Sequence, residues 1–276
     1  MTRSVRVSAV SPAIRAGRVE ENLRACEQGI AEAVANGSKL IVLPELATSG
    51  YAFSSYEEAE SSSMAADDDR LLGLAAGLPR DVVVVIGFAE RLHRGLANSV
   101  VALTSQGPIG SYRKTHLWGS EPDFFVRGDA APPVVPTPFG RLGLAICYDI
   151  EFPEVPRSLK LEGAELLASP VAWPLVPRPD GERAPELVLA MASARANRLP
   201  IVIADHSGSD GGVEWTAGTA IIDGDGWVLQ EREPHALADV QIPADSSAGP
   251  LNDLIGDRRP EIYLPLGTRT QRSDHS

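Results

Sequence analysis

The sequence predicts an α/β protein in which helices cover the outer faces of two sheets that pack face to face. A strand, a helix and a second strand can be read within the first 43 residues, and the same order returns between residues 141 and 205. Residues 99–104 and 109–113 read as strands with no helix between them, which indicates a partly antiparallel or mixed sheet. No linker, low-complexity tract or repeat interrupts the chain, so we expect one domain over residues 1–276.

The N-terminal half combines apolar strands with amphipathic helices. Residues 5–10 alternate and are rich in β-branched side chains, and residues 17–35 carry apolar side chains at helical spacing. Residues 39–43 form a short apolar run. A second helical stretch at residues 70–76 precedes residues 81–86, which are too apolar to be half exposed. These patterns predict buried strands with helices packed on them.

The C-terminal half repeats the pattern after a loop rich in Pro and Gly. Residues 141–147 read as a buried strand and residues 154–162 as a helix with Pro156 in its first turn, where proline is tolerated. Pro, Ser, Gly and charged residues dominate from Ala244, so residues 244–276 are expected to form a tail over the surface or a subunit interface. The elements expected between these parts are a strand, a helix and three strands: residues 164–169, 185–198, 201–205, 219–223 and 227–230.

Composition excludes several classes of protein. The net charge of -12 argues against a nucleic acid partner, because phosphate binding requires clustered Lys and Arg. No apolar stretch has the length of a signal peptide or a membrane span, so we expect a cytoplasmic protein with no membrane partner. Two cysteines cannot build a disulfide framework, and the five histidines lack metal-binding spacing, so no metal is expected.

Cys147 closes the strand at residues 141–147 and precedes a predicted helix. Unpaired backbone N–H groups and the positive end of a helix favour the thiolate, which is the state a nucleophile needs. A buried structural cysteine explains this local pattern equally well. Cys26 lies inside an amphipathic helix and is interpreted as structural.

Two further strands end in ionisable side chains. Glu45 follows an apolar strand and Pro44, and it can act as a general base if burial raises its pKa. Lys114 closes the strand at residues 109–113 and can donate to a developing oxyanion. Taken singly, each reads better as a solvated residue. Ligands in such sheets collect at the carboxyl ends of strands, so the combination of acid, amine and thiol predicts one shared site.

The stretches around these three residues resemble the nitrilase superfamily of carbon–nitrogen hydrolases, and the resemblance covers nearly the whole chain in the family's order. Chance is a poor explanation for such an ordered match. The matching stretches are Leu40-Ile-Val-Leu-Pro-Glu45, Tyr112-Arg-Lys-Thr-His-Leu-Trp118 with Glu121, Phe125-Val-Arg-Gly-Asp129, Gly140-Arg-Leu-Gly-Leu-Ala-Ile-Cys-Tyr-Asp-Ile-Glu-Phe-Pro-Glu154, Arg195-Ala-Asn197 and Gly218-Thr-Ala-Ile-Ile-Asp-Gly-Asp-Gly226.

The resemblance implies a four-layer αββα sandwich of two mixed sheets that assembles as a homodimer or a higher homo-oligomer. It also implies that Cys147 is the nucleophile, Glu45 the general base, Lys114 the oxyanion stabiliser and Glu121 a second carboxylate that orients the triad or substrate. The Cys147-Tyr148-Asp149 sequence is similar to the amidase and carbamoyl-hydrolase branches. Two positions depart from the family's pattern, Asp205, where relatives often carry Asn, and Thr219, where many carry Ser. Both lie away from the triad motifs, so they bear on the substrate that the resemblance implies more than on the chemistry.

The sequence therefore predicts an amidase that converts a small aliphatic or arylalkyl carboxamide to a carboxylate and ammonia through a cysteine thioester, without a cofactor. His116, a rival base, has no orienting partner evident from sequence and is expected in the pocket wall. An N-carbamoyl amino acid hydrolase or an ω-amidase is an alternative that would need Arg127, Arg178 or Arg183 to bind a substrate carboxylate. A non-catalytic interaction scaffold is a further alternative. The side chains predicted to line the pocket are Tyr51, His116, Trp118, Tyr148 and Trp173.

Overall fold

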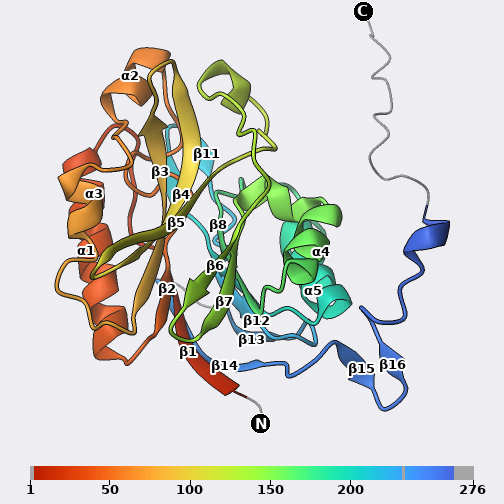
Figure 1. Cartoon of the computed structure of the whole chain (residues 1–276). Helices are drawn as coiled ribbons and strands as arrows, with labels where there is room; N and C mark the ends of the chain where they lie inside the picture. The colour runs from red at the N-terminus through yellow and green to blue at the C-terminus, as the bar shows by residue number, and fades with distance from the viewer. Residues whose placement is uncertain (1–2, 232–233, 264–276) are drawn as a thin grey trace, which may run out of the picture.

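The computed structural model describes residues 3–231 and 234–263, and within them two six-stranded sheets pack between two layers of helices (Figure 1). The strand order is β14-β1-β2-β3-β4-β5 in the first sheet and β13-β12-β9-β8-β7-β6 in the second. Helices α1, α2 and α3 cover the first sheet, and α4 and α5 cover the second. The predicted αββα sandwich is confirmed.

The first sheet is mixed, because β1, β2 and β3 run parallel while the other pairs are antiparallel. The expected strands are present, with ends that differ from the prediction by up to five residues. β14 was not predicted, although it pairs with β1 from Arg3 to Val10. The strands are β1 (Arg3–Val10), β2 (Leu40–Val42), β3 (Val83–Arg91), β4 (Leu96–Thr104), β5 (Gly107–Arg113) and β14 (His235–Ile242).

The second sheet is also mixed, with β7, β8 and β9 parallel. Its edge strand β6 lies in the stretch that the sequence predicted to be a loop rich in Pro and Gly. That prediction was wrong because an edge strand tolerates a proline such as Pro136, which the sheet interior does not. The strands are β6 (Val134–Thr137), β7 (Gly140–Leu144), β8 (Leu166–Pro170), β9 (Ile201–Ala204), β12 (Ala220–Ile222) and β13 (Val228–Glu231).

The helices bury one face against the sheets. α1 places Leu23, Cys26 and Ile30 at helical spacing in the apolar layer beneath the first sheet. The Ser55 side chain caps α2 by accepting from the Glu58 N–H. No helix among the described residues has the length and apolar character of a membrane span. The helices are α1 (Val19–Ala35), α2 (Tyr56–Ser61), α3 (Asp69–Gly73), α4 (Glu154–Leu161) and α5 (Pro185–Asn197).

Smaller elements complete the fold. Two short hairpins lie outside the main sheets. One pairs β10 (Ser209–Asp210) with β11 (Val213–Glu214), and the other pairs β15 (Ser247–Gly249) with β16 (Asn252–Asp253). The described part of the predicted tail contacts α4, where Arg157 donates to the Leu254 carbonyl over 3.2 Å. Residues 264–276 of that tail lie outside the described residues. Three 3₁₀ turns are η1 (Glu121–Asp123), η2 (Cys147–Glu151) and η3 (Pro260–Ile262).

The main core lies between the two sheets. It joins Val7 and Val85 of the first sheet to Leu144 and Ile203 of the second, all fully buried. Strands that are buried on both faces have no solvent-exposed side, so most of their side chains are apolar. This arrangement places the ionisable strand-end residues in a buried position at the junction of the two sheets.

Candidate active site

Glu45, Lys114 and Cys147 come from loops that follow three different strands, and all three are buried. Glu45 lies three residues after β2, Lys114 directly follows β5, and Cys147 begins η2 after β7. The relative exposures are 0% for Glu45, 1% for Lys114 and 6% for Cys147. The interpretation of Glu45 and Lys114 as solvated residues is therefore wrong.

Lys114 joins the two predicted carboxylates. Its Nζ donates to Oε1 of Glu45 and to Oε1 of Glu121, each over 2.7 Å. The sequence separation between Lys114 and Glu45 is 69 residues, so this contact exists only because the chain folds. A buried ammonium between two carboxylates satisfies the condition that buried charges be paired.

Asn98 of β4 is a component of this cluster that the sequence analysis missed. Its Nδ2 donates to Oε1 of Glu45 over 2.6 Å and to Oε1 of Glu121 over 3.2 Å. A fully buried asparagine within a strand is unusual, because Asn is depleted in strands. An Asn in a predicted apolar strand can therefore mark a functional position. Sequence alone does not indicate which polar residue of such a strand contacts the site.

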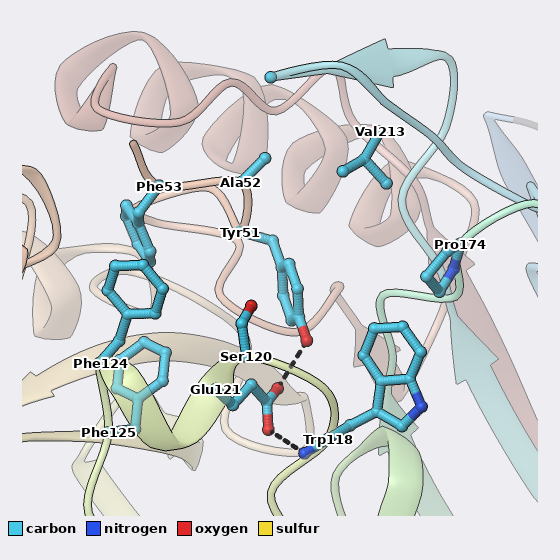
Figure 2. Close-up of a pocket in the computed structure, with 11 residues that line it drawn as sticks. Tyr51, Ala52, Phe53, Trp118, Ser120, Glu121, Phe124, Phe125, Pro174 and Val213 are labelled. Atoms are coloured by element: carbon cyan, nitrogen blue, oxygen red, sulfur yellow. Dashed lines mark hydrogen bonds between the residues drawn. The ribbon is translucent and has the colours of Figure 1, made fainter. Parts of the chain in front are cut away.

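Glu121 is held from two further directions. The Tyr51 hydroxyl donates to Oε1 over 2.8 Å, and the Trp118 backbone N–H donates to Oε2 over 2.8 Å, as Figure 2 shows. Both oxygens of Glu121 are therefore occupied. In contrast, Oε2 of Glu45 is buried and has no hydrogen-bond partner among the described residues. Glu45 thus keeps one oxygen for proton transfer.

The environment shifts the ionisation of the three side chains. Burial raises the pKa of Glu45 to about 7, although Lys114 opposes the shift. Burial alone would lower the pKa of Lys114, but the neighbouring Glu45, Cys147 and Glu121 raise it, so the ammonium stays charged. Burial and the charge of Glu45 hold the pKa of the Cys147 thiol well above its usual value.

The backbone at Cys147 differs from the predicted strand-to-helix junction. Cys147 has φ 47°, a left-handed conformation that costs a non-glycine residue about 1–2 kcal/mol, and it starts a 3₁₀ turn rather than an α-helix. The expectation that local N–H groups favour a thiolate is wrong, because burial outweighs them. The sulfur lies 4.0 Å from the Ala172 carbonyl oxygen.

Asp149 connects the 3₁₀ turn that begins at Cys147 to the segment that carries Lys114. Its Oδ2 accepts from the Ile146 N–H over 3.1 Å, and its Oδ1 lies 2.7 Å from Nδ1 of His116. His116 therefore has an orienting partner that the sequence did not reveal. The His116 ring stacks on Phe152 with centroids 4.0 Å apart, which gives this side chain a structural position beside the turn.

A cavity of about 300 Å³ opens next to Glu121. In Figure 2, Tyr51 lies between two groups of lining residues. Phe53, Phe124 and Phe125 lie on one side of it, and Trp118, Pro174 and Val213 lie on the other side. Two of the predicted pocket residues, Tyr51 and Trp118, line this cavity. The complete lining is Tyr51, Ala52, Phe53, Trp118, Ser120, Glu121, Phe124, Phe125, Pro174, Gly211 and Val213.

His116, Tyr148 and Trp173 do not line this cavity. The Tyr148 ring packs edge-on against Phe152 with centroids 4.9 Å apart. Trp173 is 1% exposed and belongs to the main core. Cys147, Glu45 and Lys114 are also absent from the lining of this cavity, so the contact of the other three predicted pocket residues with substrate stays a prediction. Among the described residues, no group of three or more His, Cys, Asp or Glu side chains is arranged to hold a metal ion.

The chain is similar to known carbon–nitrogen hydrolases in sequence and in fold. The carbon–nitrogen hydrolase family model matches residues 6–246. A nitrilase from Pyrococcus abyssi is 33% identical over 255 residues, which cover 89% of this chain and 94% of that protein. An (R)-stereoselective amidase from a Pseudomonas species is 33% identical over 279 residues, covering 98% of this chain and 96% of that protein.

Solved structures agree with these matches. The crystal structure of an amidase from a Nesterenkonia species has a TM-score of 0.75 and 27% identity, over 93% of this chain and 94% of that one. One mutant of such an amidase shows covalent addition of the acetamide moiety of fluoroacetamide at the active site cysteine. Another mutant was solved in complex with butyramide.

Proposed function

The chain belongs to the carbon–nitrogen hydrolase family and acts on carbon–nitrogen bonds other than peptide bonds, and we propose that its substrate is a small, uncharged carboxamide. The observation that carries this proposal is the cluster in which Lys114 holds one oxygen of Glu45 while the other oxygen stays free. A cysteine nucleophile, a base whose pKa is raised to about 7 and an ammonium held by two carboxylates are the groups that acyl transfer from an amide uses.

In the proposed reaction, Oε2 of Glu45 takes the proton of the Cys147 thiol as the sulfur bonds to the amide carbon. Lys114 and the Tyr148 backbone N–H donate to the resulting oxyanion. Glu45 then protonates the leaving nitrogen, the carbon–nitrogen bond breaks, and ammonia departs from a thioester. A water molecule loses its proton to Glu45 and attacks the thioester, and the departing sulfur recovers that proton.

The cavity favours an uncharged acyl group. Its lining is aromatic and aliphatic apart from the Tyr51 hydroxyl, Ser120 and Glu121, and it contains no Lys or Arg among the described residues. Both oxygens of Glu121 are already occupied. A substrate carboxylate would find no cation there. This composition supports a neutral aliphatic or arylalkyl amide.

The three arginines considered for a carboxylate clamp lie elsewhere. Arg183 forms an ion pair with Glu231, and Arg178 lines a separate cavity. Arg127 is exposed and is not among the residues that line the cavity beside Glu121. These positions favour the amidase over the N-carbamoyl amino acid hydrolase and the ω-amidase.

The test is intact-mass spectrometry after brief mixing with a panel of neutral amides, N-carbamoyl amino acids and ω-amides. We expect acyl adducts with neutral amides and a mass increase located on Cys147. Cys147→Ala should form no adduct and show no turnover, whereas Cys26→Ser, which changes the fully buried cysteine of α1, should keep both. Adducts only from carbamoyl substrates, or turnover by Cys147→Ala, would refute the proposal.

We also propose that two copies of the chain form a homodimer through the face of α5. Val188 and Leu189 of this helix are 48% and 41% exposed, so this part of α5 presents two adjacent apolar side chains that a second copy would cover. Light scattering during size-exclusion chromatography should give twice the chain mass. Replacing both residues by Glu should give the single-chain mass, and a monomeric wild type would refute the proposal.

A further inference from the structure

Asp205 and His206 follow β9 and are buried, at 0% and 2% exposure. The Asp205 carboxylate accepts three backbone N–H groups. Its Oδ1 accepts from Trp173 over 2.9 Å and from His206 over 2.8 Å, and its Oδ2 accepts from Gly218 over 2.7 Å. Because a buried carboxylate is tolerated only when its oxygens are hydrogen-bonded, these donors determine its orientation. The carboxylate thereby joins three loops.

The loop after β8 links this carboxylate to the reacting groups. The Val171 carbonyl accepts from the Glu45 N–H over 3.3 Å, and the Ala172 carbonyl lies 4.0 Å from the Cys147 sulfur. The backbone N–H of the next residue, Trp173, donates to the Asp205 carboxylate. Three consecutive residues therefore contact the backbone of the base, the sulfur of the nucleophile and the Asp205 carboxylate.

His206 holds Glu45 from the other side. Its Nε2 lies 2.6 Å from the Glu45 carbonyl oxygen, and a carbonyl only accepts, so Nε2 carries the hydrogen. Burial lowers the pKa of His206 to about 4, so the ring stays neutral at the pH at which Glu45 titrates. The Glu45 backbone is thus fixed at its N–H by Val171 and at its carbonyl by His206.

The His206 ring is linked to the cavity indirectly, through Trp215 and Tyr51. It lies 5.0 Å from the Trp215 ring, which packs edge-on against Tyr51 with centroids 5.6 Å apart. The Tyr51 hydroxyl donates to Glu121. A displacement of His206 would therefore affect both the base and the second carboxylate.

From these contacts we propose that Asp205 and His206 are positioning residues. They hold Glu45 and the Ala172 carbonyl in a fixed position relative to Cys147. The inference rests on the proposed function, because it assigns a role toward the base and the nucleophile of that reaction. Neither residue contacts the cavity beside Glu121, so they act through the backbone of Glu45 and the loop after β8.

Two substitutions remove the contacts without changing the size of the side chain much. Asp205→Leu places a branched apolar side chain at this position and removes all three acceptor bonds. His206→Phe keeps a ring beside Trp215 and removes the donor to Glu45. A displacement of about 1 Å at a catalytic group costs about 10²-fold in rate. We expect kcat to fall by about 10- to 100-fold in both variants, with KM changed by less than about threefold.

Two control variants separate positioning from general packing. His206→Gln retains an N–H donor at a similar reach and should restore most of the kcat that His206→Phe loses. Ser11→Ala removes a 2.6 Å bond to the Asp205 backbone carbonyl but leaves its carboxylate bonds intact, so kcat should stay close to that of the wild type. All values are measured on folded protein at one temperature, with unfolding recorded separately.

The rate at which iodoacetamide alkylates Cys147, read by peptide mass spectrometry, gives a measure that needs no substrate. It should fall in Asp205→Leu and His206→Phe, because proton removal from the thiol depends on Glu45. A lower melting temperature with unchanged kcat and alkylation rate would overturn the inference, as would His206→Gln behaving like His206→Phe. If Asp205→Leu does not fold, the two His206 variants decide. If the wild type is alkylated at Cys147 but hydrolyses no amide, the proposed function itself is refuted.

Discussion

Gly87 of β3 provides a sharp test of how closely the Glu45 backbone must be held. A Cβ added at Gly87 would lie 2.6 Å from Cα of Glu45 and 2.6 Å from the Leu46 backbone nitrogen. Nonbonded carbon atoms need about 3.5–4.0 Å, so Gly87→Ala forces the Glu45 loop to move by about 1 Å. Overpacking of this size costs about 1–3 kcal/mol of stability, and the displaced base costs about 10²-fold in kcat.

The assay combines urea unfolding with steady-state kinetics on the amide that gives the strongest adduct. Gly73→Ala is the matched control, because its added Cβ meets no heavy atom within 4 Å. We expect that variant to stay within about 0.5 kcal/mol of the wild type and to keep its kcat. A folded Gly87→Ala enzyme with wild-type kcat would show that the base tolerates displacement, and this reasoning would then be wrong.

Three further predictions follow from the site. Lys114→Ala leaves two buried carboxylates without their ammonium and should lower the free energy of unfolding by about 3–5 kcal/mol in urea titrations, and a loss below about 1 kcal/mol would contradict the pairing. Because burial raises the pKa of Glu45 to about 7 and a base must be ionised, kcat/KM should fall about tenfold per pH unit below pH 7, and a flat profile there would exclude Glu45 as the base. Trp118→Ala keeps the backbone N–H that binds Glu121 but removes an aromatic wall, so KM for neutral amides should rise about 3- to 10-fold with little change in kcat, which steady-state kinetics on the panel will check.

The elements with strong local patterns were predicted well. The apolar runs that became β2, β3 and β9 and the spacing of α1 depend on neighbouring residues, so period and composition suffice to recognise them. The strand β14 was missed because its burial depends on pairing with β1, more than two hundred residues earlier in the chain. Edge strands also carry weaker apolar patterns, because more of their side chains face solvent.

The sequence by itself determined the fold class, the family resemblance and the positions of Glu45, Lys114 and Cys147 at strand ends. Only the tertiary structure decided that Lys114 contacts both carboxylates, that Asn98 and His206 hold Glu45, and that burial raises the pKa of the Cys147 thiol. The physical reason is that hydrogen-bond partners and burial are properties of the two packed sheets. Residues far apart in the chain approach within 3 Å there, and no local pattern records which ones do.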